Sequence, residues 1–199
     1  MSLPATYFDA LYAGCDDPWS FRSRWYEKRK RSLLLASLPR ERFACAFEPG
    51  CSNGELTSEL AQRCDRVIAS DSSARAVDLA RQRTHAQANV ELSTGRVPDD
   101  WPDGVQDLVV LSEVAYYLDA QALQRLAART LSSLAADGVV VACHWRHRVP
   151  DYPQGGGAVH ACLAAALTLP QLTRHVEPDF LLDVWTADPR SVAQREGLA

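Results

Sequence analysis

Short apolar runs alternate with amphipathic segments along most of the chain. The apolar runs are expected to form strands, at residues 44–48, 67–70, 90–93, 107–112 and 139–143. Residues 55–63, 74–84 and 120–136 instead carry apolar side chains at helical spacing. The last of these helices is expected to stop before Asp137, with Gly138 in the position that follows a helix. Apolar strands that alternate with helices predict βαβ units, in which helices cover both faces of a parallel sheet.

Two further strand-like segments close the pattern, at residues 172–176 and 180–186, around a turn at residues 177–179. No helix fits between them, so we expect an antiparallel hairpin at one edge of the sheet. The pattern as a whole predicts an α/β fold with a Rossmann-like, mostly parallel, doubly wound sheet. In such sheets a ligand binds beyond the carboxyl ends of the strands.

The composition is that of one globular domain with an additional arm. Of the 199 residues, 47% are apolar and 23% are charged, and 21 basic against 25 acidic residues give a net charge of −4. This balance argues against general binding to nucleic acid or to an anionic membrane. Six dispersed cysteines without a Cys-x-x-Cys pair or zinc-ligand spacing indicate reduced thiols and no metal. With no signal peptide or membrane-spanning stretch in the sequence, we expect a cytoplasmic protein; its oligomeric state is left open.

The first strand leads into a turn with the sequence Glu-Pro-Gly-Cys-Ser-Asn-Gly, residues 48–54. A dinucleotide fingerprint needs glycine at positions 50, 52 and 55, and only Gly50 is present. Glu48 and Glu55 also put carboxylates where a pyrophosphate would lie, so a dinucleotide-dependent oxidoreductase is disfavoured. A nucleoside with a cationic centre and no phosphate suits these charges better, and S-adenosylmethionine is such a ligand.

The same turn resembles motif I of the class I methyltransferases, in which an acidic residue precedes spaced glycines. Gly50 and Gly54 would let the backbone pass close to the methionyl part of the cofactor, and Ser52 replaces the usual middle glycine. Asp71, at the end of the second strand, is expected to accept both hydroxyls of a ribose. Taken alone, an aspartate at a strand end is more often a helix N-cap, and Ser72 or Ser73 could cap the helix instead. The order and spacing of the two features together favour the cofactor.

Three further strand ends are expected to border the same site. Arg96 and Val97 follow the third strand, where backbone groups and apolar packing would contact the adenine. Ser112 ends the fourth strand and is expected to contact the cofactor. Polar and aromatic residues at 113–117 and 144–147 follow the two central strands, as a pocket for a methyl acceptor requires.

Several motifs resemble those of the nodulation-protein-S-like methyltransferases: Asp17-Pro18-Trp19, Tyr26-Glu27-x-x-Lys30, residues 48–52, Leu111-Ser112-Glu113 with Tyr116-Tyr117, residues 144–147, and Asp151-Tyr152-Pro153 with His160. The resemblance extends from about residue 7 to residue 185. It implies a seven-stranded class I fold, with residues 41–190 as the S-adenosylmethionine-binding domain, and methylation of a small molecule, often at nitrogen. In the branch that carries the name, the acceptor is a sugar amine of a chitooligosaccharide, but many relatives have no known acceptor.

Residues 1–40 are expected to form a helical arm. Its basic run at residues 28–31 suits an amphipathic helix with a solvated face. The alternative is a lid, because Tyr26 and Lys30 lie four residues apart and so share a helical face. From there they would hold the cofactor carboxylate, with Trp19 closing over it. The resemblance favours this role for Tyr26 and Lys30, whereas the basic residues at 28, 29 and 31 are assigned to the solvated face.

Methyl transfer is a direct displacement, so alignment and exclusion of water supply most of the acceleration. A base is required only if the acceptor must lose a proton. His144 is the favoured candidate, because it follows a buried strand that faces the expected site. Tyr117 and Glu113 are further candidates, and Glu113 would equally brace its loop. For His160 a structural role stays open, and so does a methyltransferase-like binding domain without catalysis.

Overall fold

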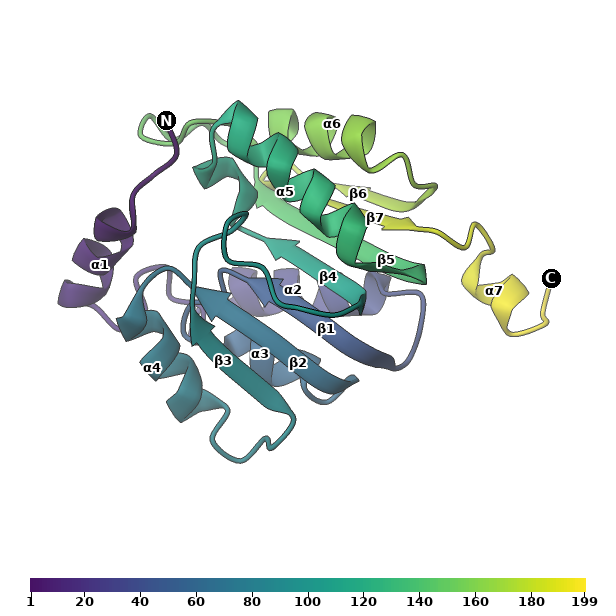
Figure 1. Ribbon diagram of the computed structural model, residues 1–199, viewed down its shortest axis with the longest axis horizontal. Coiled ribbons are helices and arrows are strands. Elements are labelled where there is room, and N and C mark those ends of the chain that lie inside the picture. Colours follow the sequence, from purple (N-terminus) through teal and green to yellow (C-terminus); the bar gives the residue numbers. More distant parts are fainter.

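The computed structural model describes residues 1–199 and contains one seven-stranded sheet in the order β3-β2-β1-β4-β5-β7-β6 (Figure 1). The strands are β1 (Phe43–Pro49), β2 (Cys64–Asp71), β3 (Val90–Thr94), β4 (Gln106–Ser112), β5 (Leu134–Trp145), β6 (Gln171–Val176) and β7 (Phe180–Thr186). The first five strands pair in parallel, whereas β7 is antiparallel to both β5 and β6. The predicted α/β fold with an antiparallel C-terminal hairpin at the sheet edge is therefore confirmed.

Helices cover both faces of this sheet. They are α1 (Ala5–Gly14), α2 (Trp25–Ser37), α3 (Glu55–Leu60), α4 (Ala74–Arg83), α5 (Ala120–Ser133), α6 (Gly156–Leu167) and α7 (Val192–Arg195), with a 3₁₀ turn η1 (Ala115–Tyr117). In Figure 1, α5 and α6 lie in front of the sheet and α2 and α3 behind it. The longest helix, α5, has 14 residues, and none is long and apolar enough to cross a membrane.

The two central strands separate two apolar cores. Because successive strand residues point to opposite faces, Leu108 and Val110 pack with Leu34 of α2 on one side. Val109 and Leu111 pack on the other side, in the cluster that α5 and α6 complete. Burial on both faces explains why these strands are continuous apolar runs rather than alternating ones. The strand order reverses between β1 and β4, so the crevice predicted for a ligand opens beyond these two strands.

The predicted end of the helix before β5 is wrong. The helix stops at Ser133, and Gly138 lies inside β5 rather than after a helix. Leu134 already pairs with Gln106, across an irregularity in the β4–β5 ladder. A Cβ atom on Gly138 would lie only 2.5 Å from the Leu134 side chain. The glycine is therefore required by close packing within the irregular start of the strand.

Candidate functional site

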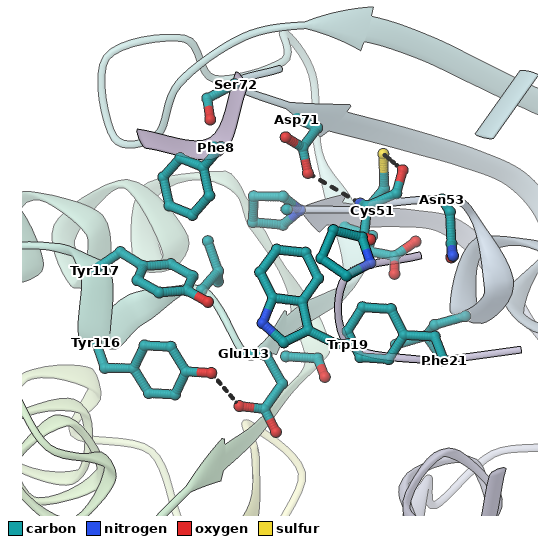
Figure 2. Close-up of a pocket in the computed structure, with 18 of the residues that line it drawn as sticks. Phe8, Trp19, Phe21, Cys51, Asn53, Asp71, Ser72, Glu113, Tyr116 and Tyr117 are labelled. Carbon is teal, nitrogen blue, oxygen red and sulfur yellow. Dashed lines mark hydrogen bonds between the residues drawn. The ribbon is translucent and has the colours of Figure 1, made fainter. Parts of the chain in front are cut away.

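A cavity of about 380 Å³ lies at the carboxyl ends of the strands, a volume suited to a small molecule. Most of the residues predicted from the sequence line it: Trp19, Tyr26, Lys30, Glu48, Gly50, Ser52, Asp71, Arg96, Val97, Ser112, Glu113 and Tyr117. Gly54 and His144 are not among the lining residues. Figure 2 shows the indole of Trp19 surrounded in this view by Tyr117, Phe8, Asp71 and Asn53.

The turn after β1 uses its two glycines for different purposes. Both have positive φ, +77° at Gly50 and +79° at Gly54. A Cβ on Gly50 would lie 3.0 Å from the Val114 side chain, which also lines the cavity. A Cβ on Gly54 would instead lie 2.8 Å from the Cα of Ala80, in α4. Gly54 therefore lets α3 pack against α4, and its predicted approach to the cofactor is replaced by a packing role.

Ser52 stands at the position where the middle glycine of the motif is usual, and its side chain makes a specific contact. Its backbone is also left-handed, with φ +52°. Its hydroxyl lies 2.5 Å from the hydroxyl of Tyr12, in α1. Tyr12 is buried and lines the cavity, but sequence reasoning missed it. The Ser52 hydroxyl thus connects the turn to the arm, a contact that a glycine at this position could not make.

Asp71 is buried at the end of β2, with its carboxylate on the cavity side of the turn (Figure 2). One oxygen accepts from the Ser52 amide and the other from the Ser73 amide, both at 2.9 Å. A carboxylate has about four acceptor positions, so acceptor capacity remains for a ligand. The bond to Ser73 also resembles a helix cap, and the two interpretations of Asp71 are therefore compatible.

Glu48 lies beneath the turn and has no cationic partner within bonding distance. The Thr57 hydroxyl donates to its carboxylate at 2.7 Å. Burial raises the pKa of Glu48 to about 8, and the nearby Asp71 contributes in the same direction. A positively charged ligand nearby would favour the ionised form of both groups. The carboxylates expected from the sequence to suit a cationic ligand are those of Glu48 and Glu55; both line the cavity, and Glu55 is paired with Arg83 at 2.9 Å.

Lys30 does not point to an open anion site. Its Nζ atom lies 2.6 Å from Oε1 of Glu113 and 3.0 Å from Oε2 of Glu27. Burial alone would lower the pKa of Lys30, but these two carboxylates raise it. The Lys30 charge is thus already matched, which differs from the expected clamp on a cofactor carboxylate. The buried hydroxyl of Tyr26, by contrast, has no hydrogen-bond partner.

Arg31 is not solvated, so its assignment to the exposed basic face is wrong. It is buried, lines the cavity, and donates to the Phe21 carbonyl at 2.9 Å and to Glu59 at 3.0 Å. The buried residues of α2 are Glu27, Lys30, Arg31 and Leu34. Their spacing of three, four and seven residues places them on one helical face, but three of the four are charged, so the sequence did not mark this face as buried.

Glu113 joins three elements around the end of β4. Besides Lys30 on α2, it accepts from the Trp145 amide at 3.1 Å and from the Tyr116 hydroxyl (Figure 2). Its own backbone is left-handed, with φ +53°. Three donors on one carboxylate favour the interpretation of Glu113 as a brace of its loop rather than as a base.

Aromatic side chains form one wall of the cavity. The Tyr117 hydroxyl lies 3.4 Å from that of Tyr152, and the ring of Tyr116 stacks on Tyr152 with centroids 5.0 Å apart. Phe8 packs edge-on against Tyr117 at 4.8 Å. We call these four residues the aromatic wall. Phe8 was not singled out from the sequence, because its contact spans more than a hundred residues of chain.

The segment before α1 joins this wall to the end of β3. The Leu3 amide donates to the Tyr117 carbonyl at 2.9 Å, and the Arg96 guanidinium donates to the Leu3 carbonyl at 2.9 Å. The Arg96 amide is engaged by Asp100 at 2.8 Å, so it is not free for the expected contact with adenine. Val97 is buried and presents the expected apolar surface.

His144 lies behind the cavity wall rather than facing it. It is fully buried, and its Nε2 atom is 3.2 Å from the Ala115 amide. Its Nδ1 atom lies 3.1 Å from Nε2 of His160. Because η1 and α6 cover the end of β5, both ring nitrogens are occupied. The expectation that His144 faces the transferred methyl group does not agree with this placement.

Comparison with known proteins places this architecture in a family. The model of the family Nodulation protein S (NodS) matches residues 11–170. The chain belongs to the NodS family. This confirms the family indicated by the sequence motifs. The matched range also includes every element that lines the cavity except the segment before α1 and the first part of that helix.

Individual relatives agree with the family. Nodulation protein S of Rhizobium tropici is 35% identical over 124 residues, which is 62% of this chain and 52% of the relative. The chain thus spans about half the length of the curated relatives that it matches. A crystal structure from Pseudomonas syringae, of a protein described as a methyltransferase, is 50% identical with a TM-score of 0.74, covering 82% of this chain and 99% of that one.

The crystal structure of N-methyltransferase NodS from Bradyrhizobium japonicum WM9, in complex with S-adenosylhomocysteine, is 25% identical to this chain. Its TM-score is 0.83, and the match covers 94% of this chain and 98% of the NodS chain. The match therefore extends over nearly the whole chain.

Proposed function

We propose that this protein is an S-adenosylmethionine-dependent methyltransferase that methylates a small polar molecule at an amine nitrogen. The observation that carries the proposal is the cavity itself. It joins the buried carboxylates of Asp71 and Glu48, beside the Gly50 turn, to the aromatic wall at the far end. Membership of the NodS family, which includes an N-methyltransferase in complex with S-adenosylhomocysteine, supports this use of the cavity.

The residues at the β1–β2 end suit the cofactor. Asp71 retains acceptor capacity for the ribose hydroxyls, and Glu48, whose pKa burial raises to about 8, would give up its proton to match the cationic part of the ligand. The unpartnered hydroxyl of Tyr26 and the unpartnered side-chain oxygen of Asn53 are buried polar groups that border the cavity. Buried polar groups normally have partners, so a polar ligand accounts for both. When bound, the cofactor supplies a methyl group already activated by its sulfonium charge.

The residues at the other end suit an amine. Aromatic ring faces attract cationic and methylated nitrogen, and the aromatic wall provides four such rings. The carboxylate of Glu113 is occupied by Lys30, Tyr116 and Trp145, so it is not free to take a proton from the acceptor. The aromatic wall then acts by orienting the acceptor and excluding water. An amine that enters in its neutral form needs no base for its attack on the methyl group. A sugar amine is the first acceptor to test.

Calorimetry separates the function classes that the sequence left open. We expect S-adenosylmethionine and S-adenosylhomocysteine to bind and NAD not to bind. Binding of NAD alone would instead support an oxidoreductase. Transfer is then measured with methyl-labelled cofactor and three matched sugars: glucosamine, N-acetylglucosamine and glucose. Label on glucosamine only supports N-methylation, label on glucose indicates oxygen as the acceptor, and cofactor binding without transfer to any small molecule favours a binding domain.

A further inference from the structure

A line of hydrogen-bonded side chains crosses the core behind the aromatic wall. Asp183 on β7 lies 2.6 Å from Nδ1 of His160 on α6, and Nε2 of His160 lies 3.1 Å from Nδ1 of His144 on β5. Nε2 of His144 accepts from the backbone amide of Ala115, the first residue of η1, at 3.2 Å. All three side chains are at most 2% exposed. Four separate elements therefore meet in one chain of hydrogen bonds.

Only one placement of protons satisfies every bond in this chain. The Ala115 amide is always a donor, so Nε2 of His144 must carry a lone pair and its proton must be on Nδ1. That proton is donated to Nε2 of His160, whose own proton is then on Nδ1 and is donated to Asp183. A charged His160 would force the His144 proton onto Nε2, where it would oppose the Ala115 N–H. Burial also lowers the pKa of His144 well below its usual range, and the neighbouring His160 lowers it further.

The Asp183 end of this series of hydrogen bonds is anchored in the sheet. Asp183 accepts a second bond from the side-chain amide of Gln171 at 2.7 Å, so its carboxylate is held by β6 as well as by α6. On β5, Ala142 pairs directly with Asp183 in the ladder. The carboxylate is thus fixed relative to the strand that carries His144.

Gly156 sets the position of α6 against this strand. A Cβ atom on Gly156 would lie 2.3 Å from the carbonyl oxygen of Trp145 and 3.3 Å from the Cβ of His144. Only glycine allows the first turn of α6 to approach the backbone so closely. His160 is four residues further along, on the same helical face. The contact at Gly156 therefore brings His160 against His144.

We propose that Asp183, His160 and His144 are positioning residues that fix η1, and with it the two tyrosines of the aromatic wall that η1 carries. The chain ends on a backbone amide rather than in the cavity, so it does not deliver a proton to a ligand. Its effect reaches the site through the backbone, because Tyr116 and Tyr117 follow Ala115 directly, and through the Tyr116 ring, which packs edge-on against the His144 ring at 5.2 Å. The inference deepens the proposed function, but its test needs no methyl acceptor and no turnover.

Imidazole nitrogen NMR of the wild-type protein tests the proton placement directly. At neutral pH both His144 and His160 are expected to be uncharged, with the proton on Nδ1 in each ring. A protonated ring, or a proton on Nε2 of either residue, would overturn the proposal. This measurement does not depend on whether any variant folds.

Two substitutions at one position test the positioning role. The glutamine in His144→Gln has an acceptor and a donor on one planar side-chain amide, so it retains the direction of the hydrogen bonds. The leucine in His144→Leu removes both groups. Hydrogen exchange at the Ala115 amide is expected to accelerate by about tenfold or more in His144→Leu and to return to within about threefold of wild type in His144→Gln. Equal exchange in both variants and wild type would overturn the proposal.

Leu163→Ala is the matched control, because Leu163 is a fully buried residue of α6 that takes no part in these hydrogen bonds. It is expected to lower global stability while Ala115 exchange changes only with the global transition. If Leu163→Ala and His144→Leu accelerated the Ala115 amide equally at equal global stability, the residues would be packing residues only. Affinity for S-adenosylhomocysteine, measured on the same variants, reports separately on the proposed function, since Asp71 is untouched.

Discussion

The two ends of the cavity are built in different ways. The end at Asp71 is centred on a single βαβ unit, within residues 48–73, where turn amides and buried carboxylates lie close in sequence, and the arm adds Tyr12 and Tyr26 to it. The aromatic-wall end collects Phe8, η1 and Tyr152, and depends on β5, α6 and β7 behind it. A local motif supplies the carboxylates and turn amides of the first end, whereas the second end depends on contacts between distant elements throughout.

This difference determines how each end of the cavity responds to a substitution. A substitution at the β1–β2 end removes a contact with the ligand and leaves the sheet in place. A substitution behind the aromatic wall moves a backbone segment, so its effects spread to residues that it does not touch. The following experiments test whether the two ends are separable in this sense.

The largest effect is expected from Asp71→Ala. Loss of two charge-assisted hydrogen bonds to a ribose, at about 1.5–3 kcal/mol each, lowers affinity for S-adenosylhomocysteine by about 100-fold or more. Asp65→Ala is the control, because Asp65 lies on the same strand at its other end and is exposed. Calorimetry on both variants decides the point. Wild-type affinity in Asp71→Ala would remove the ribose assignment.

The two glycines of the turn should separate ligand binding from packing. Gly54→Ala places a Cβ against the α4 backbone at positive φ, and a loss of about 2 kcal/mol in the free energy of unfolding is expected. Its affinity for S-adenosylhomocysteine, measured below the unfolding transition, should stay near wild type. Gly50→Ala should lower affinity as well, because Val114 is displaced into the cavity. Equal loss of affinity in both variants would show that the turn acts as one unit.

Glu48 should make the stability of the free protein depend on pH. An unfolded glutamate titrates near 4.3, whereas the pKa of folded Glu48 is about 8. Between these values the folded state binds more protons, so the free energy of unfolding falls as pH rises, by at most about 1.4 kcal/mol per unit, and levels off above 8. Denaturant titrations should show that Glu48→Gln lacks this component.

A cationic ligand should also displace the Glu48 proton. Near pH 7 the apparent binding enthalpy of S-adenosylhomocysteine, with its positive amino group, should change with the ionisation enthalpy of the buffer. Glu48→Gln should abolish that dependence. Buffer-independent enthalpy in the wild type would mean that Glu48 does not change its protonation on binding.

The smallest effect is expected from Tyr117→Phe. Its hydroxyl makes one long contact of 3.4 Å with Tyr152, so stability should change by less than about 1 kcal/mol. Affinity for S-adenosylhomocysteine should be unchanged if the two ends are independent. A tenfold loss of affinity would place Tyr117 against the cofactor instead of the acceptor.

The sequence was informative where structure depends on local pattern. The strands, the antiparallel hairpin and the turn at residues 48–54 follow from apolar periodicity and motif spacing, and all lie where predicted. Gly138 shows the limit of such reasoning: a glycine after a helical pattern is typical of a helix end, but here the contact with Leu134 and the ladder to β4 decided its place.

The roles of individual side chains were harder to predict because they depend on long-range partners. His144 was correctly located at the end of a strand, yet α6 and η1 cover it, and no pattern near residue 144 indicates this. Lys30 was expected to face an anion from a ligand, but it meets Glu113 from the other side of the sheet. Arg31 was misplaced for a similar reason, since its buried face of α2 also carries Glu27 and Lys30 and is not marked by apolar residues.

Leu3 and Phe8 border the cavity from a segment that lies outside residues 11–170, the part shared with the NodS family. This segment is held near the Tyr117 turn by the backbone bond from Leu3 to Tyr117, by the Arg96 bond to the Leu3 carbonyl, and by bonds between Ser2 and Asp119. Exchange of this short stretch would therefore alter the aromatic-wall end of the cavity and leave the carboxylates of the β1–β2 turn in place. If the acceptor binds at the aromatic wall, as proposed, residues 1–10 are the place to alter acceptor choice without redesigning the sheet.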